Sequence, residues 1–325
     1  MSGVRTRPLG ATGITVSDIG FGAWGIGGAT AGATSYGATD DGRSLDALTR
    51  AFDLGITFYD TSNAYGDGHS EHLIGRAFAG RRDRVVIATK AGFPRFDQPQ
   101  DFSPGHLRAS LEASLRRFDT DHVDLFQLHS PPIALVRERG EIIETLRALV
   151  TEGKARAFGI SVKAPDDARV AIEELGFPVV QLNLNLVDQR AWDTGLLDLA
   201  AARGVGIITR TPLCFGLLAG KVAPDTVFDP ADHRSAWPKA QIARWIEGSR
   251  LFVAAVAGRT RQTPAQVALR FCLSHPAVSS TIPGILAPAE AEENAAASAL
   301  GPLSADEIAE IRRIYAGETF FVGRG

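Results

Sequence analysis

The chain has 325 residues, of which 45% are hydrophobic and 22% are charged, so it is long enough to bury a large core. Its formal net charge of -3 argues against the basic surface that nucleic-acid binding requires. No apolar run approaches the roughly 18 residues of a membrane span and no signal-peptide pattern opens the chain, so we expect a cytoplasmic protein without membrane or nucleic-acid partners.

In chain order, residues 6–9 and 14–16 predict a small β-hairpin joined by a Gly-Ala-Thr-Gly turn. Short apolar strands and amphipathic helices then alternate along the chain. We expect strands at residues 19–22, 58–60, 85–89, 123–128, 157–160, 179–182, 206–209 and 278–282. Helices are expected at residues 44–54, 71–78, 107–118, 138–152, 164–175, 192–203 and 288–297, and an extra one at residues 305–315. The helix of the seventh unit is expected only after a long irregular segment.

Eight strand and helix units at this spacing indicate parallel strands joined by right-handed crossovers, and eight such strands can close into a barrel. We therefore predict an α/β fold, a (β/α)8 TIM barrel with an N-terminal β-hairpin and extra C-terminal helices. The segment after the seventh strand, residues 213–237, far exceeds the usual connection of ~2–6 residues, which favours a functional lid or clamp. The tail, residues 319–323, is expected to fold over the barrel, and residues 1–325 are expected to form one domain.

Four side chains that could take part in catalysis lie at or just after the ends of three successive strands. Asp60 ends the second strand and Tyr65 lies in the loop after it, while Lys90 and His129 end the third and fourth strands. Because the carboxyl ends of the strands line one mouth of a parallel barrel, we expect these four side chains to meet. The alternative is a purely structural ion pair between Asp60 and Lys90, with His129 as a bystander.

Together these four residues suit proton transfer to a carbonyl oxygen. A cation beside a phenol stabilises the phenolate, so Lys90 would help Tyr65 to exchange its proton. Asp60 would keep Lys90 charged, and a neutral His129 would donate to the same oxygen. Neither a nucleophile with its base nor a metal-ligand spacing is present, so no metal site is predicted. The missing ingredient is a hydride donor, which a cofactor must supply.

The chain resembles the aldo-keto reductases, nicotinamide-dependent enzymes built on a (β/α)8 barrel. The resemblance runs nearly end to end and rests on residues 9–13 (Leu-Gly-Ala-Thr-Gly), residues 60–66, Lys90 and residues 128–131 (Leu-His-Ser-Pro). It implies that Asp60, Tyr65, Lys90 and His129 are catalytic, with Tyr65 as the general acid or base. The implied reaction moves a hydride between the cofactor and a sugar or a small aromatic or aliphatic aldehyde or ketone.

The resemblance also implies a cofactor site in the second half of the chain. Ser161 and Gln181 would hold the nicotinamide carboxamide, the loop ending at Lys221 would bind the pyrophosphate, and Asn294 would contact adenine. The implied cofactor residues are Ser161, Gln181, Arg210, Thr211, Pro212, Leu213, Gly216, Leu217, Gly220, Lys221, Arg234, Gly284, Glu290, Glu293 and Asn294.

Departures from the family pattern concern the cofactor. Val162 replaces an Asn of many relatives, and Arg210 replaces an aromatic residue that stacks on the nicotinamide; a guanidinium can also stack, and its charge would disfavour the oxidised cofactor. Residues 282–294 contain no Lys or Arg, and Glu290 stands where relatives place Gln or Arg near the adenosine 2′-phosphate. Arg234, on the loop after the seventh strand, would supply the missing positive charge, because similar loops in the family fold over the cofactor with an Arg. Family habit favours NADPH and the local charges favour NADH, so NADPH is expected, with NADH as a close alternative.

Loop aromatics outline the site of a small carbonyl substrate. Trp24 and Phe93 are expected to contact it, and Tyr36, Phe96 and Trp237 also fall on loops at the mouth. Two other classes of protein stay open from the residues alone. One is a non-catalytic, nicotinamide-sensing subunit that resembles the channel β-subunits of the same family, and the other is a metal-dependent barrel hydrolase.

Overall fold

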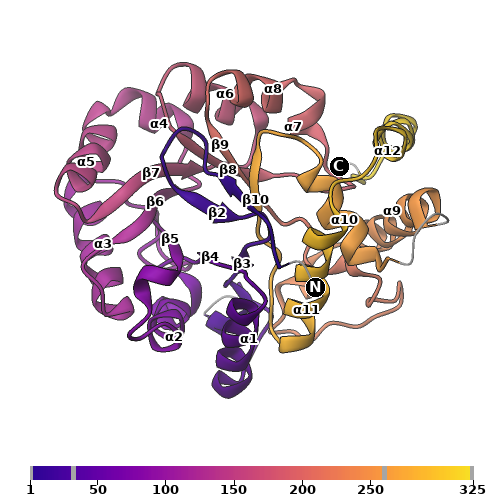
Figure 1. Ribbon diagram of the computed structural model, residues 1–325, viewed down its shortest axis with the longest axis horizontal. Coiled ribbons are helices and arrows are strands. Elements are labelled where there is room, and N and C mark those ends of the chain that lie inside the picture. The colour runs from indigo at the N-terminus through magenta and orange to yellow at the C-terminus, as the bar shows by residue number, and fades with distance from the viewer. Residues whose placement is uncertain (1–2, 31–33, 258–261, 323–325) are drawn as a thin grey trace.

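The computed structural model describes residues 3–30, 34–257 and 262–322, and it shows a ring of strands surrounded by helices (Figure 1). The ring consists of eight parallel strands hydrogen-bonded in chain order. They are β3 (Phe21–Gly22), β4 (Phe58–Asp60), β5 (Val86–Ala91), β6 (Val123–His129), β7 (Ala155–Ser161), β8 (Val179–Asn183), β9 (Gly206–Arg210) and β10 (Val278–Thr281). The ring closes where the amides of Gly20 and Gly22 donate to the carbonyls of Thr281 and Pro283. The expected (β/α)8 barrel is confirmed.

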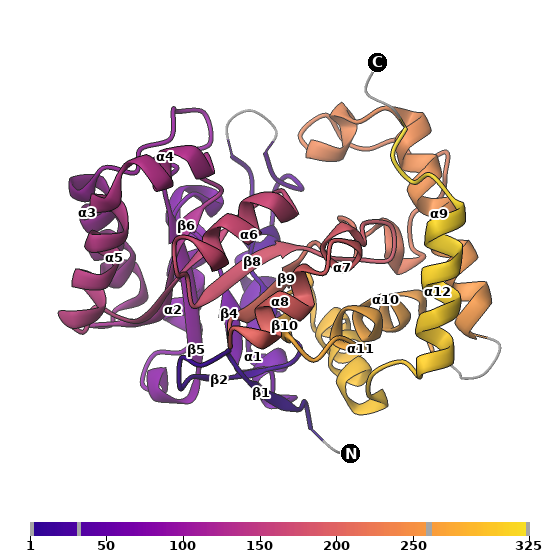
Figure 2. The same ribbon diagram turned by 90° about the horizontal axis from the view of Figure 1, so that it is seen from above.

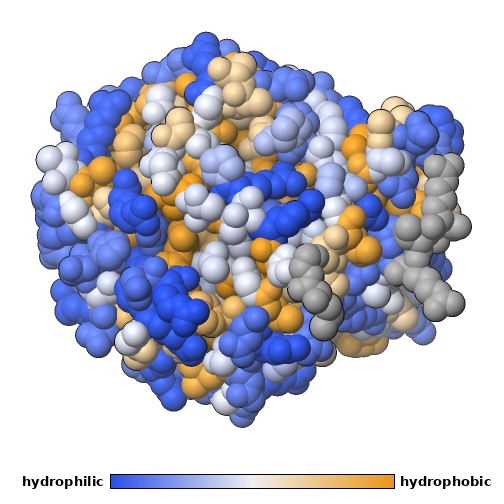
Figure 3. All heavy atoms as spheres, viewed as in Figure 1, coloured by the Kyte–Doolittle hydropathy of each residue, from blue (hydrophilic) through white to orange (hydrophobic). Residues whose placement is uncertain are grey.

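An antiparallel hairpin, β1 (Thr6–Pro8) and β2 (Thr15–Ser17), crosses one end of the barrel (Figure 1). Leu9, Ile14 and Val16 of this hairpin pack against the apolar interior of the barrel. On the outer surface of this end, hydrophobic residues lie among predominantly hydrophilic ones (Figure 3). Figure 2 shows the loops that follow the strands at the opposite end. Because the hairpin closes its end, that opposite end is the open one.

The helices surround the barrel and mostly follow the expected order. They are α1 (Asp41–Asp53), α2 (His69–Ala77), α3 (Pro104–Phe118), α4 (Ile133–Glu138), α5 (Gly140–Thr151), α6 (Pro165–Glu173), α7 (Arg190–Asp193), α8 (Leu196–Ala202), α9 (Lys239–Ala257), α10 (Pro264–Leu273), α11 (Pro288–Leu300) and α12 (Ala305–Gly317). Several begin at N-cap residues whose side chains bond to the first turn: Ser103 accepts from the amide of His106, and Ser304 and Glu307 form a capping box.

One expected helix is wrong in outline, because it is two helices. Residues 192–203 divide at Gly195, whose φ of 67° lies in the left-handed region and separates α7 from α8. Buried apolar residues lie on both sides of Gly195, so periodicity alone misses this break. The expected helix 138–152 is α5, and the short helix α4 before it was not expected; Arg139 (φ -112°, ψ 82°) separates the two.

The C-terminal third adds helices beside the barrel. Helices α9, α10 and α12 lie together on one side in both views (Figures 1 and 2). The tail runs along this group: Phe320 is buried against Phe252 and Tyr315, and Phe321 lines the cavity described below. The tail was expected to fold over the barrel as residues 319–323, of which residue 323 lies outside the described part. No helix of the described residues has the length and apolar character needed to cross a membrane.

Candidate active site

A polar layer lies one pleat above the apolar layer of the barrel interior. The apolar layer includes Phe58, Ala88, Leu125, Ala157, Val179, Ile208 and Ile282, which form one buried cluster. Side chains alternate between the two faces of a strand, so residues two positions further on also face inward. Those residues are Asp60, Lys90, Gln127, Gly159, Gln181, Arg210 and Gly284. The barrel therefore changes from apolar to polar within one pleat as it opens.

Lys90 connects Asp60 to Tyr65. Its ammonium donates to Asp60 Oδ1 at 2.5 Å, to the Thr61 carbonyl at 2.8 Å and to the Tyr65 hydroxyl at 3.3 Å. The Lys90 and Asp60 side chains are 1% and 3% exposed. Burial opposes the charge of the ammonium, but its interactions with Asp60 and Tyr65 together outweigh this, so the pKa of Lys90 is raised. Lys90 therefore stays charged beside the phenol.

The second oxygen of Asp60 accepts from two glutamine amides. Gln181 Nε2 lies 2.8 Å and Gln127 Nε2 lies 3.1 Å from Asp60 Oδ2. Both glutamines are fully buried or nearly so. An ion pair in an apolar interior is stable only when its remaining hydrogen-bonding capacity is used, and here the amides provide that.

A tight turn places Tyr65 over this ion pair. Tyr65 begins the short 3₁₀ turn η2 (Tyr65–Gly68), and the next residue, Gly66, has φ 62°. A Cβ atom on Gly66 would lie 2.0 Å from the Gly27 carbonyl oxygen, so the turn requires glycine here. The Tyr65 ring lies with its centroid 5.0 Å from the Lys90 ammonium.

His129 ends β6 and lines the same cavity as Tyr65. Burial, followed by the charges of Lys90, Arg210 and Lys163, lowers the pKa of His129 well below its usual value, so the ring is neutral at physiological pH. Its Nδ1 lies 3.1 Å from the Ser62 hydroxyl. When Ser62 donates in this bond, Nε2 carries the proton and serves as a hydrogen-bond donor.

The four expected catalytic side chains therefore lie together at the open end of the barrel, beside a cavity of about 1020 Å³. Most of the residues expected to bind cofactor line this cavity: Gln181, Arg210, Thr211, Pro212, Leu213, Gly216, Lys221, Arg234, Gly284, Glu290, Glu293 and Asn294. Two others lie away from it, since Leu217 packs against Ile242 and Ile246, and Gly220 packs against Pro264. Ser161 lies behind Gln181 and Arg210 and bonds to both.

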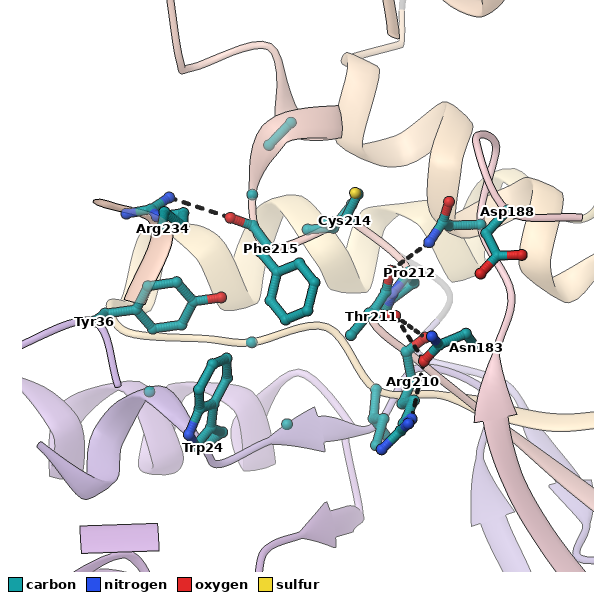
Figure 4. Close-up of a pocket in the computed structure, with 18 of the residues that line it drawn as sticks. Trp24, Tyr36, Asn183, Asp188, Arg210, Thr211, Pro212, Cys214, Phe215 and Arg234 are labelled. Atoms are coloured by element: carbon teal, nitrogen blue, oxygen red, sulfur yellow. Dashed lines mark hydrogen bonds between the residues drawn. The ribbon is translucent and has the colours of Figure 1, made fainter. Parts of the chain in front are cut away.

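Arg210 occupies the cavity at the end of β9 (Figure 4). Its guanidinium donates to Asn183 Oδ1 at 2.9 Å and to the Ser161 hydroxyl at 3.3 Å. Burial lowers the pKa of Arg210, although not enough to neutralise it. Its described hydrogen-bond acceptors are an amide and a hydroxyl, so its charge is not matched by a carboxylate contact among the described residues.

The segment after β9 crosses to the loop after β3. The His233 amide donates to the Ser35 carbonyl at 2.9 Å, and the His233 ring lies against Trp24 and Tyr36 with centroids 4.8 and 5.1 Å away. Arg234 pairs with Asp232 and donates to the Phe215 carbonyl at 3.1 Å (Figure 4). These contacts hold the segment across the cavity in the manner expected of a clamp.

The far end of the cavity lies at the start of α11. Glu290 Oε2 accepts from the Leu286 amide at 2.7 Å, and Lys221 pairs with Glu293 at 2.7 Å. Asn294 is 2% exposed, and its Nδ2 has no hydrogen-bond partner among the described residues. A buried amide donor that lines a cavity without a partner is costly unless a ligand accepts from it. The residues at this end therefore fit an adenine-bearing cofactor.

Aromatic residues surround the reacting end. Trp24 and Phe96 line the cavity, and the Phe93 ring instead packs against His129, with centroids 5.1 Å apart. Phe93 was expected to contact substrate, but its ring is not among those that line the cavity. It contacts His129 and Phe96, which do line it. Phe96 lies 6.2 Å from the Tyr65 ring, centroid to centroid.

Sequence reasoning did not select Asn183 or Gln127, although both had a detectable signal. Asn183 follows Gln181 by two residues on β8, and Gln127 precedes His129 by two on β6. The strand period therefore places each on the same face as an expected site residue. Asp188 and Arg190, a bidentate pair that also lines the cavity, lie in a loop whose path the sequence does not reveal. No group of three or more His, Cys, Asp or Glu side chains in the described chain could hold a metal ion.

Comparisons with known proteins agree with this geometry. The Aldo/keto reductase family matches residues 18–316. Aldo-keto reductase YhdN from Bacillus subtilis (strain 168) is 32% identical over 86% of this chain and 85% of its own. The NADH-specific methylglyoxal reductase of Escherichia coli (strain K12) is 29% identical over 93% of this chain and 96% of its own. The glycerol dehydrogenase AKR11B4 from Gluconobacter oxydans superposes with a TM-score of 0.81 over 98% of both chains, at 26% identity.

Proposed function

Because the chain belongs to the aldo/keto reductase family of oxidoreductases, we propose that it interconverts an aldehyde or ketone and the corresponding alcohol, with Tyr65 as the proton donor and acceptor. The observation that carries this proposal is the buried contact of Lys90 with both Asp60 and Tyr65, at 2.5 and 3.3 Å, beside the cavity. A reduced nicotinamide, when bound, supplies the hydride. The proposed reaction therefore requires no nucleophilic side chain in this cluster.

Each residue of the cluster has a distinct task in the proposed reaction. Tyr65 passes its proton to the carbonyl oxygen as negative charge develops there, and the adjacent ammonium of Lys90 stabilises the phenolate that remains. Asp60 keeps that ammonium charged and in place. Neutral His129 donates a hydrogen bond to the same oxygen and so orients the carbonyl. Alcohol oxidation uses the same groups in reverse.

The residues around the cavity support a nicotinamide dinucleotide. Gln181, which Ser161 supports from behind, offers an amide for the carboxamide, and Asn294 offers an unused amide donor for adenine. Glycines at positions 216 and 284 leave space for phosphate and ribose to approach the backbone, since nothing in the described chain lies within 3.4 Å of a Cβ added at either. A cavity of about 1020 Å³ is large enough for such a ligand.

Of the two nicotinamide cofactors, we propose NADH, which reverses the order expected from family habit. Glu290 faces the cavity, and the Leu286 amide, a donor that a 2′-phosphate could use, is already bonded to its carboxylate. The carboxylate would repel a phosphate dianion but accept from a ribose 2′-hydroxyl. Arg234, the possible compensating cation, is committed to Asp232 and to the Phe215 carbonyl.

Turnover of 4-nitrobenzaldehyde with NADH or NADPH, followed by loss of nicotinamide absorbance, tests the proposed function. Tyr65→Phe should lower kcat by about 10² to 10⁴-fold, the usual contribution of general acid catalysis, and leave the cofactor Kd unchanged. Tyr59→Phe is the matched control, because the buried Tyr59 hydroxyl bonds only to the backbone carbonyls of Ile56 and Leu48 among the described residues. Cofactor binding without turnover across a carbonyl panel would instead support the non-catalytic, nicotinamide-sensing alternative.

A further inference from the structure

Gln127 lies in the polar layer but does not line the cavity. It occupies the centre of β6, is fully buried, and pairs in register with Lys90 of β5. An uncharged amide in a barrel interior costs free energy unless its hydrogen-bonding groups are used. The Gln127 amide donates to Asp60 Oδ2 at 3.1 Å, and its own oxygen lies 3.5 Å from Gln181 Nε2. Gln127 therefore contacts the ion pair from behind.

The neighbouring strand leaves room for this side chain. Gly159 of β7 faces Gln127 in register, and a Cβ atom at position 159 would lie 3.3 Å from Gln127 Cγ and 3.2 Å from Val179 Cβ. Contacts that short require the neighbours to move. A glycine at the one inward position between Gln127 and Gln181 allows both amides to reach the same carboxylate oxygen.

The carboxylate in turn determines how both amides are oriented. An ionised Asp60 can only accept hydrogen bonds, so Gln127 and Gln181 must each present an NH₂ group to Oδ2. The oxygen of Gln181 then faces Ser161, whose hydroxyl donates to it at 3.3 Å.

We propose that Gln127 is a positioning residue, which holds the Asp60 carboxylate in the orientation that keeps Lys90 charged beside Tyr65 and keeps the Gln181 amide donating to Asp60. The inference rests on the proposed function of Asp60, Lys90 and Tyr65. Gln127 is not among the residues that line the cavity, whereas Asp60 and Gln181 are, so a ligand there would not contact Gln127. Its removal should therefore affect kcat more than the KM for either substrate.

Gln127→Glu gives the sharpest test, since it keeps the shape of the side chain and changes only its charge and donor. Two carboxyl groups this close share a proton, and the protonated form of the new side chain still donates to Asp60. At higher pH the new carboxylate repels Asp60 and draws Lys90 away from Tyr65. The other charged or titratable groups around the Asp60–Lys90 pair are His129 and Arg210, and both are present in the variant as in the unmodified protein.

We expect kcat of Gln127→Glu to fall by about tenfold or more between pH 6 and pH 9 relative to the unmodified protein, the change that loss of one hydrogen bond to a charged group produces. Gln127→Leu should lower kcat by about tenfold at all pH values, with the KM for cofactor changed less than about threefold. The matched control is Gln189→Leu, because Gln189 is also fully buried but bonds to Leu186 and Arg312. It should lose stability only.

Parallel pH profiles for Gln127→Glu and the unmodified protein, or an unchanged kcat in Gln127→Leu, would overturn the positioning role. If Tyr65→Phe still loses turnover in that experiment, the proposed function stands by itself. If Tyr65→Phe retains turnover, both proposals fail. Gln127→Glu preserves the side-chain volume, so its pH profile of kcat tests the positioning role even where Gln127→Leu does not fold.

Discussion

Replacing Lys90 with Met should destabilise the protein as well as inactivate it. The substitution keeps most of the apolar stem of the side chain but removes the ammonium that lies 2.5 Å from Asp60, whose side chain is 3% exposed. Removing one partner of a buried ion pair leaves an uncompensated charge and typically costs ~3–5 kcal/mol. Two amides still donate to Asp60, so we expect the lower end, about 3 kcal/mol.

The expected change is large enough to measure. With unfolding entropies of about 2.1 cal/mol/K per residue, a chain of 325 residues should lose about 4–5 °C in Tm for that cost. Urea unfolding followed by Trp fluorescence gives the free energy directly, and nicotinamide absorbance gives kcat on the same samples. Arg313→Met is the control, because Arg313 forms an exposed ion pair with Glu310, and it should change neither quantity measurably.

A second substitution separates the charge effect from loss of packing. Asp60→Asn in the Lys90→Met background removes the unpaired charge while its side-chain oxygen still accepts from Gln127 and Gln181. We expect the double variant to recover at least about half of the lost stability and to regain none of the activity. A double variant no more stable than Lys90→Met, or a single variant within about 1 kcal/mol of the unmodified protein, would refute the reasoning.

Three further outcomes follow from the site. Glu290→Gln should tighten NADPH binding about tenfold relative to NADH binding in fluorescence titrations, because the charge that repels the 2′-phosphate is gone. An unchanged ratio of the two Kd values would show that Glu290 does not select the cofactor. Arg210→Met should raise the affinity for oxidised cofactor relative to reduced cofactor, since the buried cation disfavours the charged ring. Because the folded-state pKa of His129 is lowered, the unfolded chain binds more protons below about pH 6.5, and stability should fall as pH falls through that value. His129→Asn should reduce that slope in urea unfolding at pH 5 to 7, whereas an unchanged slope would assign it to other groups.

The barrel and the proposed catalytic cluster follow from local sequence patterns for a physical reason. Strand ends in a parallel barrel share one mouth, so Asp60, Lys90 and His129 meet as soon as three consecutive strands are recognised. Their meeting does not depend on the conformation of any loop. Tyr65 lies only five residues beyond its strand, and a turn that requires Gly66 limits where it can go.

The remaining parts of the site depend on loop paths, which local patterns do not encode. Whether Glu290 binds the Leu286 amide or turns toward a ligand depends on the backbone between β10 and α11. The clamp depends on a contact between Ser35 and His233, which are nearly 200 positions apart in the chain. Of the two phenylalanines in the loop after β5, the sequence favoured Phe93 as the substrate contact, but the path of that loop places Phe96 on the cavity wall.

The polar layer couples the proposed catalytic groups to the barrel core. The inward side chains directly below the layer form a buried apolar cluster, so the polar residues above it must satisfy one another. Asp60 is the acceptor that permits this, since Lys90, Gln127 and Gln181 all donate to it from three different strands. A change at any of the three donors therefore alters the electrostatic surroundings of Tyr65 without touching it. Activity in this layer should consequently respond to substitutions that contact neither cofactor nor substrate, in proportion to how directly they bond to Asp60.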